Sequence, residues 1–179
     1  MTGWRKGKRL AAGIVASLIV FLEANPPATA AGPMPLGPSG LPLPRFVSLK
    51  ADKINVHLGP GKNYDVRWVY TRAGLPVEIT AEFENWRRIR DSEGSEGWVY
   101  HSLLSGRRTG LVTVKDKTEL VPTRDAPSAD GKITARLQPG VIAIVKECNG
   151  SWCRVSGDQF DGWIEQDRLW GVYPNEKLD

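Results

Sequence analysis

One stretch constrains the fold of this chain more than any other: Gly74 to Arg90, followed closely by Glu96 to Tyr100. Apolar and polar residues alternate along its first part, which predicts a strand with one buried and one solvent-facing side. A turn then leads into a return strand that opens with Trp86, and a third strand begins with Gly97 and Trp98. The residues expected on the buried side are Leu75, Val77, Ile79 and Ala81, and those expected in water are Pro76, Glu78, Thr80 and Glu82.

The same design returns later in the chain, at an offset of 66 residues. A repeat of about 60 residues is too long for a solenoid unit and suits a small independent β domain. Short strands, frequent turns and the lack of a sustained 3.6-residue period predict an all-β fold of two tandem domains, with a boundary near residues 113–117. The matched positions are Gly74 and Gly140, Trp86 and Trp152, and Gly97–Trp98 and Gly162–Trp163. The strands expected in the first unit are Lys53–Leu58, Val66–Tyr70, Leu75–Glu82, Trp86–Arg90 and Gly97–Tyr100.

The repeat places an ion pair in one unit where the other has two cysteines. Glu82 and Arg87 align with Cys148 and Cys153. An exposed cross-strand ion pair contributes well under about 1 kcal/mol. If Cys148 faces Cys153, the same register pairs Thr80 with Ile89, whereas the apolar pattern favours Ile79 opposite Ile89. A one-residue bulge near the turn reconciles the two arrangements.

The first thirty residues have the order of a secretory signal peptide. Basic residues come first, and the apolar run from Leu10 to Leu22 that follows is too short to span a bilayer, which needs roughly 20 residues. Small residues predict cleavage after Ala30, with Ala24 as a second position, and an uncleaved anchor is the alternative. The protein is then periplasmic or secreted, without stable membrane insertion.

Removing this segment changes the charge argument. The full chain has a net charge of +4, and residues 1–30 contain four Lys/Arg and one Glu, so the mature chain carries about +1. A nucleic-acid partner therefore loses the support of basicity.

Cys148 and Cys153 flank an Asn-Gly turn, which predicts a hairpin closed by a disulfide in an oxidising compartment. A metal pair is the weaker interpretation because no further cysteine is present. Residues 31–44 are rich in proline and glycine and carry no charge, which predicts an extended, poorly ordered arm. Residues 176–179 are expected to form a short tail.

Several motifs resemble those of bacterial SH3-like (SH3b) domains, of the type found in exported proteins of alphaproteobacteria. The residues that carry the likeness are Asn55–Val56 with Gly59–Pro60–Gly61, Asn85–Ile89, and Glu96–Tyr100. The resemblance implies two small five- to six-stranded barrels, at residues 45–113 and 114–175, with a 3₁₀ turn starting at His101. It also implies a non-enzymatic module that binds peptidoglycan or peptides.

In SH3-like barrels the ligand groove lies between the loop after the first strand and the turn before the return strand. By resemblance, Tyr64, Trp86 and Tyr100 line this groove, and His57 occupies a position where the family often has arginine. Aromatic side chains suit such a groove because they present flat, amphipathic surfaces. Trp98 and Trp163, each next to a glycine, are expected to be core residues that plug the barrel ends.

No constellation in the sequence predicts catalysis, a metal or a cofactor. A cysteine peptidase with Cys148 and His101 needs a reactive thiol rather than a hairpin disulfide. A glycosidase needs two carboxylates in a deep cleft, which a barrel of this size does not offer. We therefore expect a binding module for cell-wall peptide or peptidoglycan; the alternative is a periplasmic adaptor or regulator that binds an envelope protein.

Overall fold

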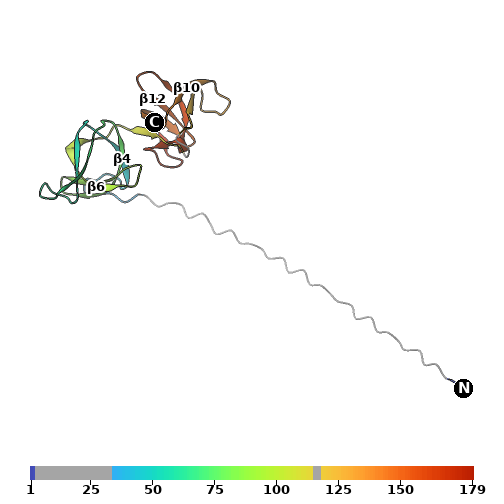
Figure 1. Ribbon diagram of the computed structural model, residues 1–179, viewed down its shortest axis with the longest axis horizontal. Coiled ribbons are helices and arrows are strands. Elements are labelled where there is room, and N and C mark those ends of the chain that lie inside the picture. Colours follow the sequence, from blue (N-terminus) through green and yellow to red (C-terminus); the bar gives the residue numbers. More distant parts are fainter. Residues whose placement is uncertain (3–33, 115–117) are drawn as a thin grey trace. The chain divides into compact units, whose positions relative to one another are not determined.

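A computed structural model of the protein describes residues 1–2, 34–114 and 118–179. Apart from its first two residues, the predicted signal peptide with its cleavage positions lies outside the described residues. The regular structure of the described part is β-strands, drawn as arrows in Figure 1, together with two short 3₁₀ helices. No helix among these residues is both long and apolar enough to cross a membrane. The prediction of an all-β fold is confirmed.

Barrel 1 is the sheet formed by β1 to β7, with strand order β3-β2-β6-β5-β4-β1-β7. All neighbouring strands in it are antiparallel. The predicted 3₁₀ turn is present between β6 and β7. The elements are β1 (Arg45–Leu49), β2 (Ile54–His57), β3 (Val66–Tyr70), β4 (Pro76–Phe83), β5 (Trp86–Arg90), β6 (Glu96–Tyr100), η1 (His101–Leu103) and β7 (Leu104–Ser105).

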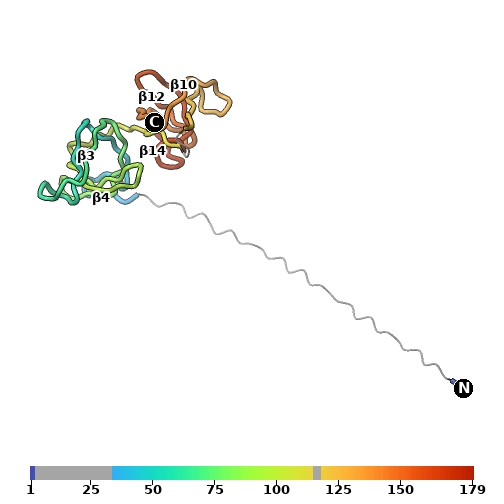
Figure 2. Tube along the Cα trace, viewed as in Figure 1, coloured from blue at the N-terminus to red at the C-terminus, as the bar shows by residue number. Residues whose placement is uncertain are grey.

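Barrel 2 repeats this topology, with order β10-β9-β13-β12-β11-β8-β14 and β15 added beside β11. Figure 2 shows that the chain completes barrel 1, in blue to green, before it enters barrel 2, in yellow to red. The elements are β8 (Thr109–Val112), β9 (Val121–Arg124), β10 (Ile133–Leu137), β11 (Ile142–Asn149), β12 (Trp152–Ser156), β13 (Asp161–Glu165), η2 (Gln166–Arg168), β14 (Leu169–Trp170) and β15 (Lys177–Leu178).

Each barrel has its own apolar core, built from alternate residues of its strands. In β4, Val77 and Ile79 are buried as the alternation predicts. In β11, the equivalent strand of barrel 2, Ala143 and Val145 are buried in the same way. The core of barrel 1 consists of Val47, Leu49, Ile54, Val56, Val77, Ile79, Ile89 and Val99. The core of barrel 2 consists of Val112, Val121, Leu137, Ala143, Val145, Cys148, Cys153, Val155, Ile164, Leu169 and Val172.

The expected bulge is present in both central hairpins. In barrel 1, Ile79 pairs with Ile89 and Glu82 with Arg87, and the register shifts between Ile79 and Ala81. In barrel 2 the register shifts at the equivalent place, between Val145 and Glu147. The extra residue lets the apolar pairs and the turn-proximal pairs both face each other.

The first strands of the two barrels, β1 and β8, are also equivalent, although the repeat seen in the sequence did not include them. β8 pairs with β11 in barrel 2, just as β1 pairs with β4 in barrel 1. Barrel 2 therefore starts by Thr109, before the expected boundary at residues 113–117. β15 likewise lies in the segment expected to be a tail, and it pairs with β11 at Cys148 and Asn149. Neither short strand has enough alternating residues to be recognised from sequence.

The N-terminal arm, residues 34–44, differs from the extended segment that its composition predicts. It turns on itself through hydrogen bonds from Gly37 N to Leu41 O (2.8 Å) and from Leu43 N to Pro35 O (2.9 Å). Ser39 fixes the turn to β4, because its backbone N and its Oγ each donate to the Glu82 carboxylate at 2.8 Å. The glycines and prolines therefore form a compact turn on barrel 1.

The side of β4 expected to face water is partly buried. Glu78 is only 2% exposed. Its carboxylate accepts hydrogen bonds from Arg90 Nε (2.9 Å) and from the hydroxyl of Tyr173 in barrel 2 (2.9 Å). Pro76 on the same side is also buried. Alternation identified Val77 and Ile79 as core residues, but Pro76 and Glu78 on the other side contact residues of barrel 2.

Candidate functional site

A surface groove in barrel 1 brings together three of the four residues that the sequence analysis assigned to ligand binding. This aromatic groove has a volume of about 320 Å³. Its floor and walls come from β2, β5, β6 and η1, and from the loop between β2 and β3. The lining residues are Lys53, Asn55, His57, Lys62, Trp86, Tyr100 and Leu103.

The sheet register places the aromatic side chains of the groove. Trp86 of β5 lies directly opposite Tyr100 of β6. Their rings meet edge to face with centroids 5.6 Å apart, and His57 packs against Trp86 in the same way at 5.2 Å. Edge-to-face packing is the favoured geometry for such rings. The three rings therefore form a preformed aromatic surface.

Tyr64, the fourth predicted residue, is exposed beside the groove and does not line it. Its carbonyl oxygen lies 2.8 Å from His57 Nδ1, so the backbone of Tyr64 orients the imidazole. Its ring lies against Gly59, where a Cβ would come within 2.4 Å of the Tyr64 ring. The Gly59–Pro60–Gly61 turn thus accommodates Tyr64, which in turn positions His57.

Two lysines that the sequence analysis did not single out give the groove its charge. Lys53 precedes β2 and Lys62 lies in the loop between β2 and β3. Both are exposed, and neither forms an ion pair within residues 34–114 and 118–179. In the sequence these lysines are marked only by being near His57, and nearness to one histidine does not distinguish a binding lysine from an ordinary surface lysine. The groove therefore combines an aromatic floor with a basic rim.

The burial of the tryptophans differs from the expectation. Trp86, expected as the more accessible one, is 7% exposed. Trp98 and Trp163, expected in the cores, are half-buried. The reason lies in the adjacent glycine: a Cβ on Gly97 would come within 2.4 Å of Val56 Cγ1, so Gly97 faces the interior. Trp98 must then point outward, because neighbouring strand residues face opposite sides.

The described residues of barrel 2 form no equivalent of the aromatic groove. The register places Arg124 where barrel 1 has His57, since each lies opposite the tryptophan of its Gly-Trp step. Arg124 donates to the carbonyl of Gly131 at 2.7 Å. Glu165 stands opposite Trp152, at the position that Tyr100 occupies opposite Trp86. An arginine, a carboxylate and one half-buried indole replace the cluster of three rings.

The acidic residues near the hairpins have structural partners. Asp91 accepts hydrogen bonds from the Tyr70 hydroxyl at 2.8 Å and from the backbone N of Ser95 at 2.8 Å. Burial, together with the hydrogen bond to Asp91, raises the pKa of Tyr70 above its ordinary value.

Within the described residues, no three His, Cys, Asp or Glu side chains form a group suited to a metal ion.

Three solved structures show low similarity to the chain. NlpC2 from Trichomonas vaginalis has 14% identity and a TM-score of 0.31, covering 71% of this chain and 48% of its own. NlpC1 from Trichomonas vaginalis has 14% identity and a TM-score of 0.31, and the match covers 78% of this chain and 47% of NlpC1. An NlpC/P60 family protein from Bacillus cereus has 9% identity and a TM-score of 0.31, and the match covers 70% of this chain and 55% of that protein. The chain spans about half the length of these proteins, and such TM-scores establish no common arrangement.

The comparison with curated proteins found no significant match. The family comparison matched the bacterial SH3 domain twice, at residues 50–106 and 117–171. The first segment covers barrel 1 apart from β1, the second covers barrel 2 apart from β8 and β15, and together they make up more than half of the sequence. The chain therefore belongs to the bacterial SH3 domain family, with two tandem copies of the domain.

Proposed function

We propose that this protein is a non-catalytic binding module of the cell envelope, and that its aromatic groove binds carboxylate-bearing peptides of the cell wall. The observation that carries the proposal is the combination of three packed rings with two exposed lysines in one groove. Membership of the bacterial SH3 domain family supports a role in binding rather than in chemistry.

The groove's chemistry favours an extended acidic peptide. Flat aromatic surfaces bind the backbone and aliphatic parts of a peptide with little loss of side-chain entropy. Lys53 and Lys62 each attract a carboxylate, and because both are solvated, each contributes about 1 kcal/mol or less. Peptides of the cell wall carry free carboxylates along an aliphatic chain, which matches this surface.

The proposed compartment is outside the cytoplasm. The disulfide between Cys148 and Cys153 supports this location because such bonds persist in oxidising compartments. The basic and apolar order of residues 1–30 agrees with export.

Co-sedimentation of the mature protein with purified peptidoglycan sacculi tests the proposal. We expect the protein to pellet, with Tyr100→Ala weakening binding about tenfold through loss of a central aromatic contact. Lys53→Gln combined with Lys62→Gln should weaken binding about fivefold and reduce its salt dependence. The charge-matched control is Lys132→Gln with Arg136→Gln, which removes two exposed positive charges from barrel 2.

Thermal unfolding of each variant shows whether barrel 1 remains folded. Binding that is absent in the wild type, or equal in the lysine variant and its control, contradicts the proposal. Capture of an envelope protein by crosslinking, without binding to sacculi, supports instead the adaptor function. Release of soluble fragments from the sacculi contradicts the non-catalytic assignment.

A further inference from the structure

A second and larger groove lies where barrel 1 meets barrel 2. It has a volume of about 780 Å³ and shares no residue with the aromatic groove. Barrel 1 contributes Phe46, Glu78 and Arg90, and barrel 2 contributes the rest. The barrel 2 side includes Ser151, Glu165, Asp167, Trp170 and Tyr173.

The walls of this inter-barrel groove are held by specific contacts. Phe46 packs between Trp170, at a centroid distance of 5.2 Å, and Tyr173, at 4.7 Å. The Tyr173 hydroxyl donates to the buried Glu78 carboxylate at 2.9 Å. Thr109 Oγ1 donates to the carbonyl of Gly74 in barrel 1 at 2.7 Å. The groove is therefore preformed, which lowers the entropic cost of binding.

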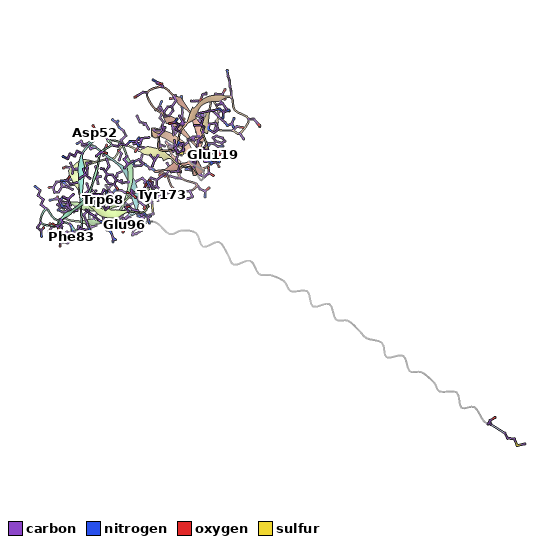
Figure 3. All side chains as sticks on the ribbon, viewed as in Figure 1. Asp52, Trp68, Phe83, Glu96, Glu119 and Tyr173 are labelled. Atoms are coloured by element: carbon purple, nitrogen blue, oxygen red, sulfur yellow. A yellow bond between two sulfur atoms is a disulfide. The ribbon has the colours of Figure 1, made fainter. Side chains whose placement is uncertain are left out.

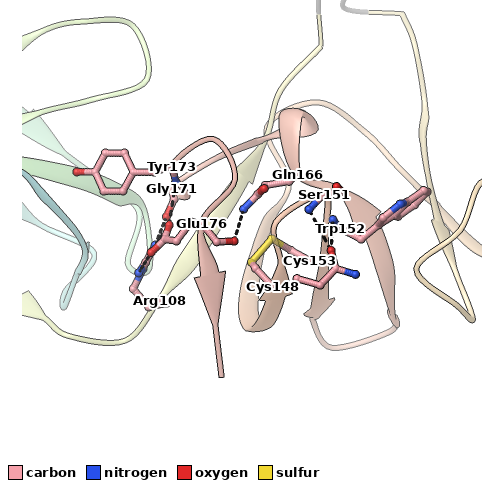
Figure 4. Close-up of a disulfide and its surroundings, with 10 residues drawn as sticks. Arg108, Cys148, Ser151, Trp152, Cys153, Gln166, Gly171, Tyr173 and Glu176 are labelled. Carbon is pink, nitrogen blue, oxygen red and sulfur yellow. Dashed lines mark hydrogen bonds and ion pairs between the residues drawn. A yellow bond between two sulfur atoms is a disulfide. The ribbon is translucent and has the colours of Figure 1, made fainter. Parts of the chain in front are cut away.

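The segment that forms one wall is also fixed within barrel 2. Arg108 donates to Glu176 Oε1 (2.8 Å) and to the carbonyl of Gly171 (2.8 Å). Gln166 Nε2 donates to the carbonyl of Glu176 at 2.9 Å, and the Cys148–Cys153 disulfide lies beside this network, as Figure 4 shows. The loop carrying Tyr173 thus has a defined position.

The charge of the inter-barrel groove is opposite to that of the aromatic groove. Among the described residues that line it, Arg90 is the one cation, and it is bound to Glu78. Glu165 and Asp167 remain at the rim, and the Asp167 side chain is 81% exposed. Arg168 lies 3.5 Å from Glu165 and 3.9 Å from Asp167 but directs its Nη1 toward Glu119, at 3.2 Å. One arginine therefore lies near three carboxylates and cannot neutralise them all, so the rim keeps a net negative charge.

We propose that the inter-barrel groove binds a peptide segment of a partner protein in which a lysine or arginine stands beside aliphatic or aromatic side chains. The apolar part of the segment packs on Phe46, Trp170 and Tyr173, and the cation lies at Glu165 and Asp167. Aromatic and aliphatic walls with a few charges at the rim are typical of peptide-binding grooves. Charge complementarity selects a basic segment over an acidic one.

Calorimetric titration of the whole mature chain with two short blocked peptides tests this site. One peptide alternates leucine and lysine, and the other alternates leucine and glutamate. We expect the lysine peptide to bind at least about tenfold more tightly. Glu165→Gln with Asp167→Asn should weaken its binding about threefold to tenfold and remove most of the salt dependence. Ser151→Trp, an exposed position on the groove wall, should abolish binding by filling the space.

Matched controls exist for both variants. Glu93→Gln with Asp130→Asn removes two exposed carboxylates that do not line the groove, and Ser92→Trp adds an exposed indole to a barrel 1 turn. Both controls should bind the lysine peptide as the wild type does. Unchanged binding by the Glu165/Asp167 and Ser151 variants overturns the proposal, as does equal affinity for the two peptides.

Other occupants give distinct results. Tighter binding of a chitin oligosaccharide than of the lysine peptide, or self-association that Ser151→Trp abolishes in sedimentation velocity, also overturns the proposal. The test is independent of the wall-binding proposal: the Lys53/Lys62 variant should bind the lysine peptide normally, and Ser151→Trp should still pellet with sacculi.

Discussion

The two barrels close the same hairpin with different chemistry. In barrel 2, Cys148 and Cys153 are joined covalently next to the turn. In barrel 1 the same register positions hold Glu82 and Arg87, whose Oε1 and Nε lie 3.0 Å apart. The shared register, including the bulge, shows that the backbone geometry is independent of the type of cross-link.

The environment of Glu82 explains how an ion pair can replace a disulfide. Its side chain is only 1% exposed, because the N-terminal arm covers it. Arg45 Nη2 donates to it at 2.6 Å, and Ser39 donates twice. The expectation of an exposed, weakly stabilising pair was therefore wrong in its premise. A carboxylate with four donors in a buried site is costly to disrupt.

The largest difference between the barrels is expected at the paired tryptophans. Trp86→Ala should lower the unfolding free energy of barrel 1 by about 3 to 5 kcal/mol, because a buried indole leaves a cavity. Trp152→Ala, at the half-buried equivalent position, should cost barrel 2 about 1 kcal/mol. Hydrogen exchange followed by mass spectrometry measures opening of each barrel separately.

Phe83→Ala is the matched control for Trp86→Ala. Phe83 lies opposite Trp86 in the hairpin, is half exposed, and lies at the edge of barrel 1 in Figure 3. Its loss should cost below about 0.5 kcal/mol. Equal losses for Trp86→Ala and Trp152→Ala would contradict the difference in burial. Because Trp86→Ala is expected to destabilise barrel 1, it is a poor variant for testing ligand binding.

The second prediction concerns the ion-pair cluster of barrel 1. Glu82→Gln should destabilise barrel 1 by about 3 kcal/mol, because Arg45 and Arg87 are left without a counter-charge in a covered site. Glu96→Gln is the matched control, since Glu96 pairs with Arg88 across β5 and β6 in a solvated position. It should cost below about 0.5 kcal/mol. Denaturant unfolding monitored by hydrogen exchange of β4 measures the stability of barrel 1 in both variants. Similar losses of stability in Glu82→Gln and Glu96→Gln would contradict a special role for the Glu82 cluster.

Glu82 also predicts a pH dependence. Burial opposes its ionisation, but hydrogen bonds from Arg45 and Ser39 and the charge of Arg87 outweigh burial and lower the pKa of Glu82 to about 2. Because the folded pKa lies below the ordinary value of 4.5, its stabilisation is complete above about pH 4.5. It is lost as the pH falls toward about 2. Barrel 1 should lose protection in that window in the wild type and much less in Glu82→Gln.

The third prediction concerns the disulfide of barrel 2. Replacing Cys148 and Cys153 by alanine should destabilise barrel 2 by about 2 kcal/mol, the amount expected for closing so short a loop. Hydrogen exchange in β11 and β12 reports the loss, while β4 and β5 of barrel 1 should be unaffected. Reduction of the wild type should give the same change. A loss shared equally by both barrels would show that the hairpins are not independent.

Much of the fold was predictable because local patterns agree with the tertiary structure. The alternation in β4 predicted the buried Val77 and Ile79, and the Asn-Gly turn predicted the hairpin that the disulfide closes. The register conflict between Ile79–Ile89 and Cys148–Cys153 even required the bulge that the structure contains. These features depend on neighbours within one hairpin, and sequence reasoning reaches them.

The features that sequence missed depend on distant partners. Glu78 looks like a solvated residue until Tyr173, 95 positions away, covers it. The arm looks disordered until Ser39 meets Glu82. In the aromatic groove, resemblance located His57, Trp86 and Tyr100, whereas Lys53 and Lys62 carry no pattern of their own. The inter-barrel groove exists only in the packed pair, so no single repeat encodes it.

The smallest expected effect is at the contact that both barrels share. Tyr173→Phe removes the hydroxyl that donates to Glu78, and should cost about 1 kcal/mol because Arg90 still pairs with the carboxylate. Burial and the bond to Glu78 raise the pKa of Tyr173 above its ordinary value, so the stabilisation from its protonated hydroxyl is complete below that ordinary value and is lost only as the pH rises above it. Hydrogen exchange should increase in both β4 and β14, unlike the single-barrel changes above. Tyr64→Phe, at an exposed tyrosine, is the control. A loss confined to one barrel would show that the bond does not couple them.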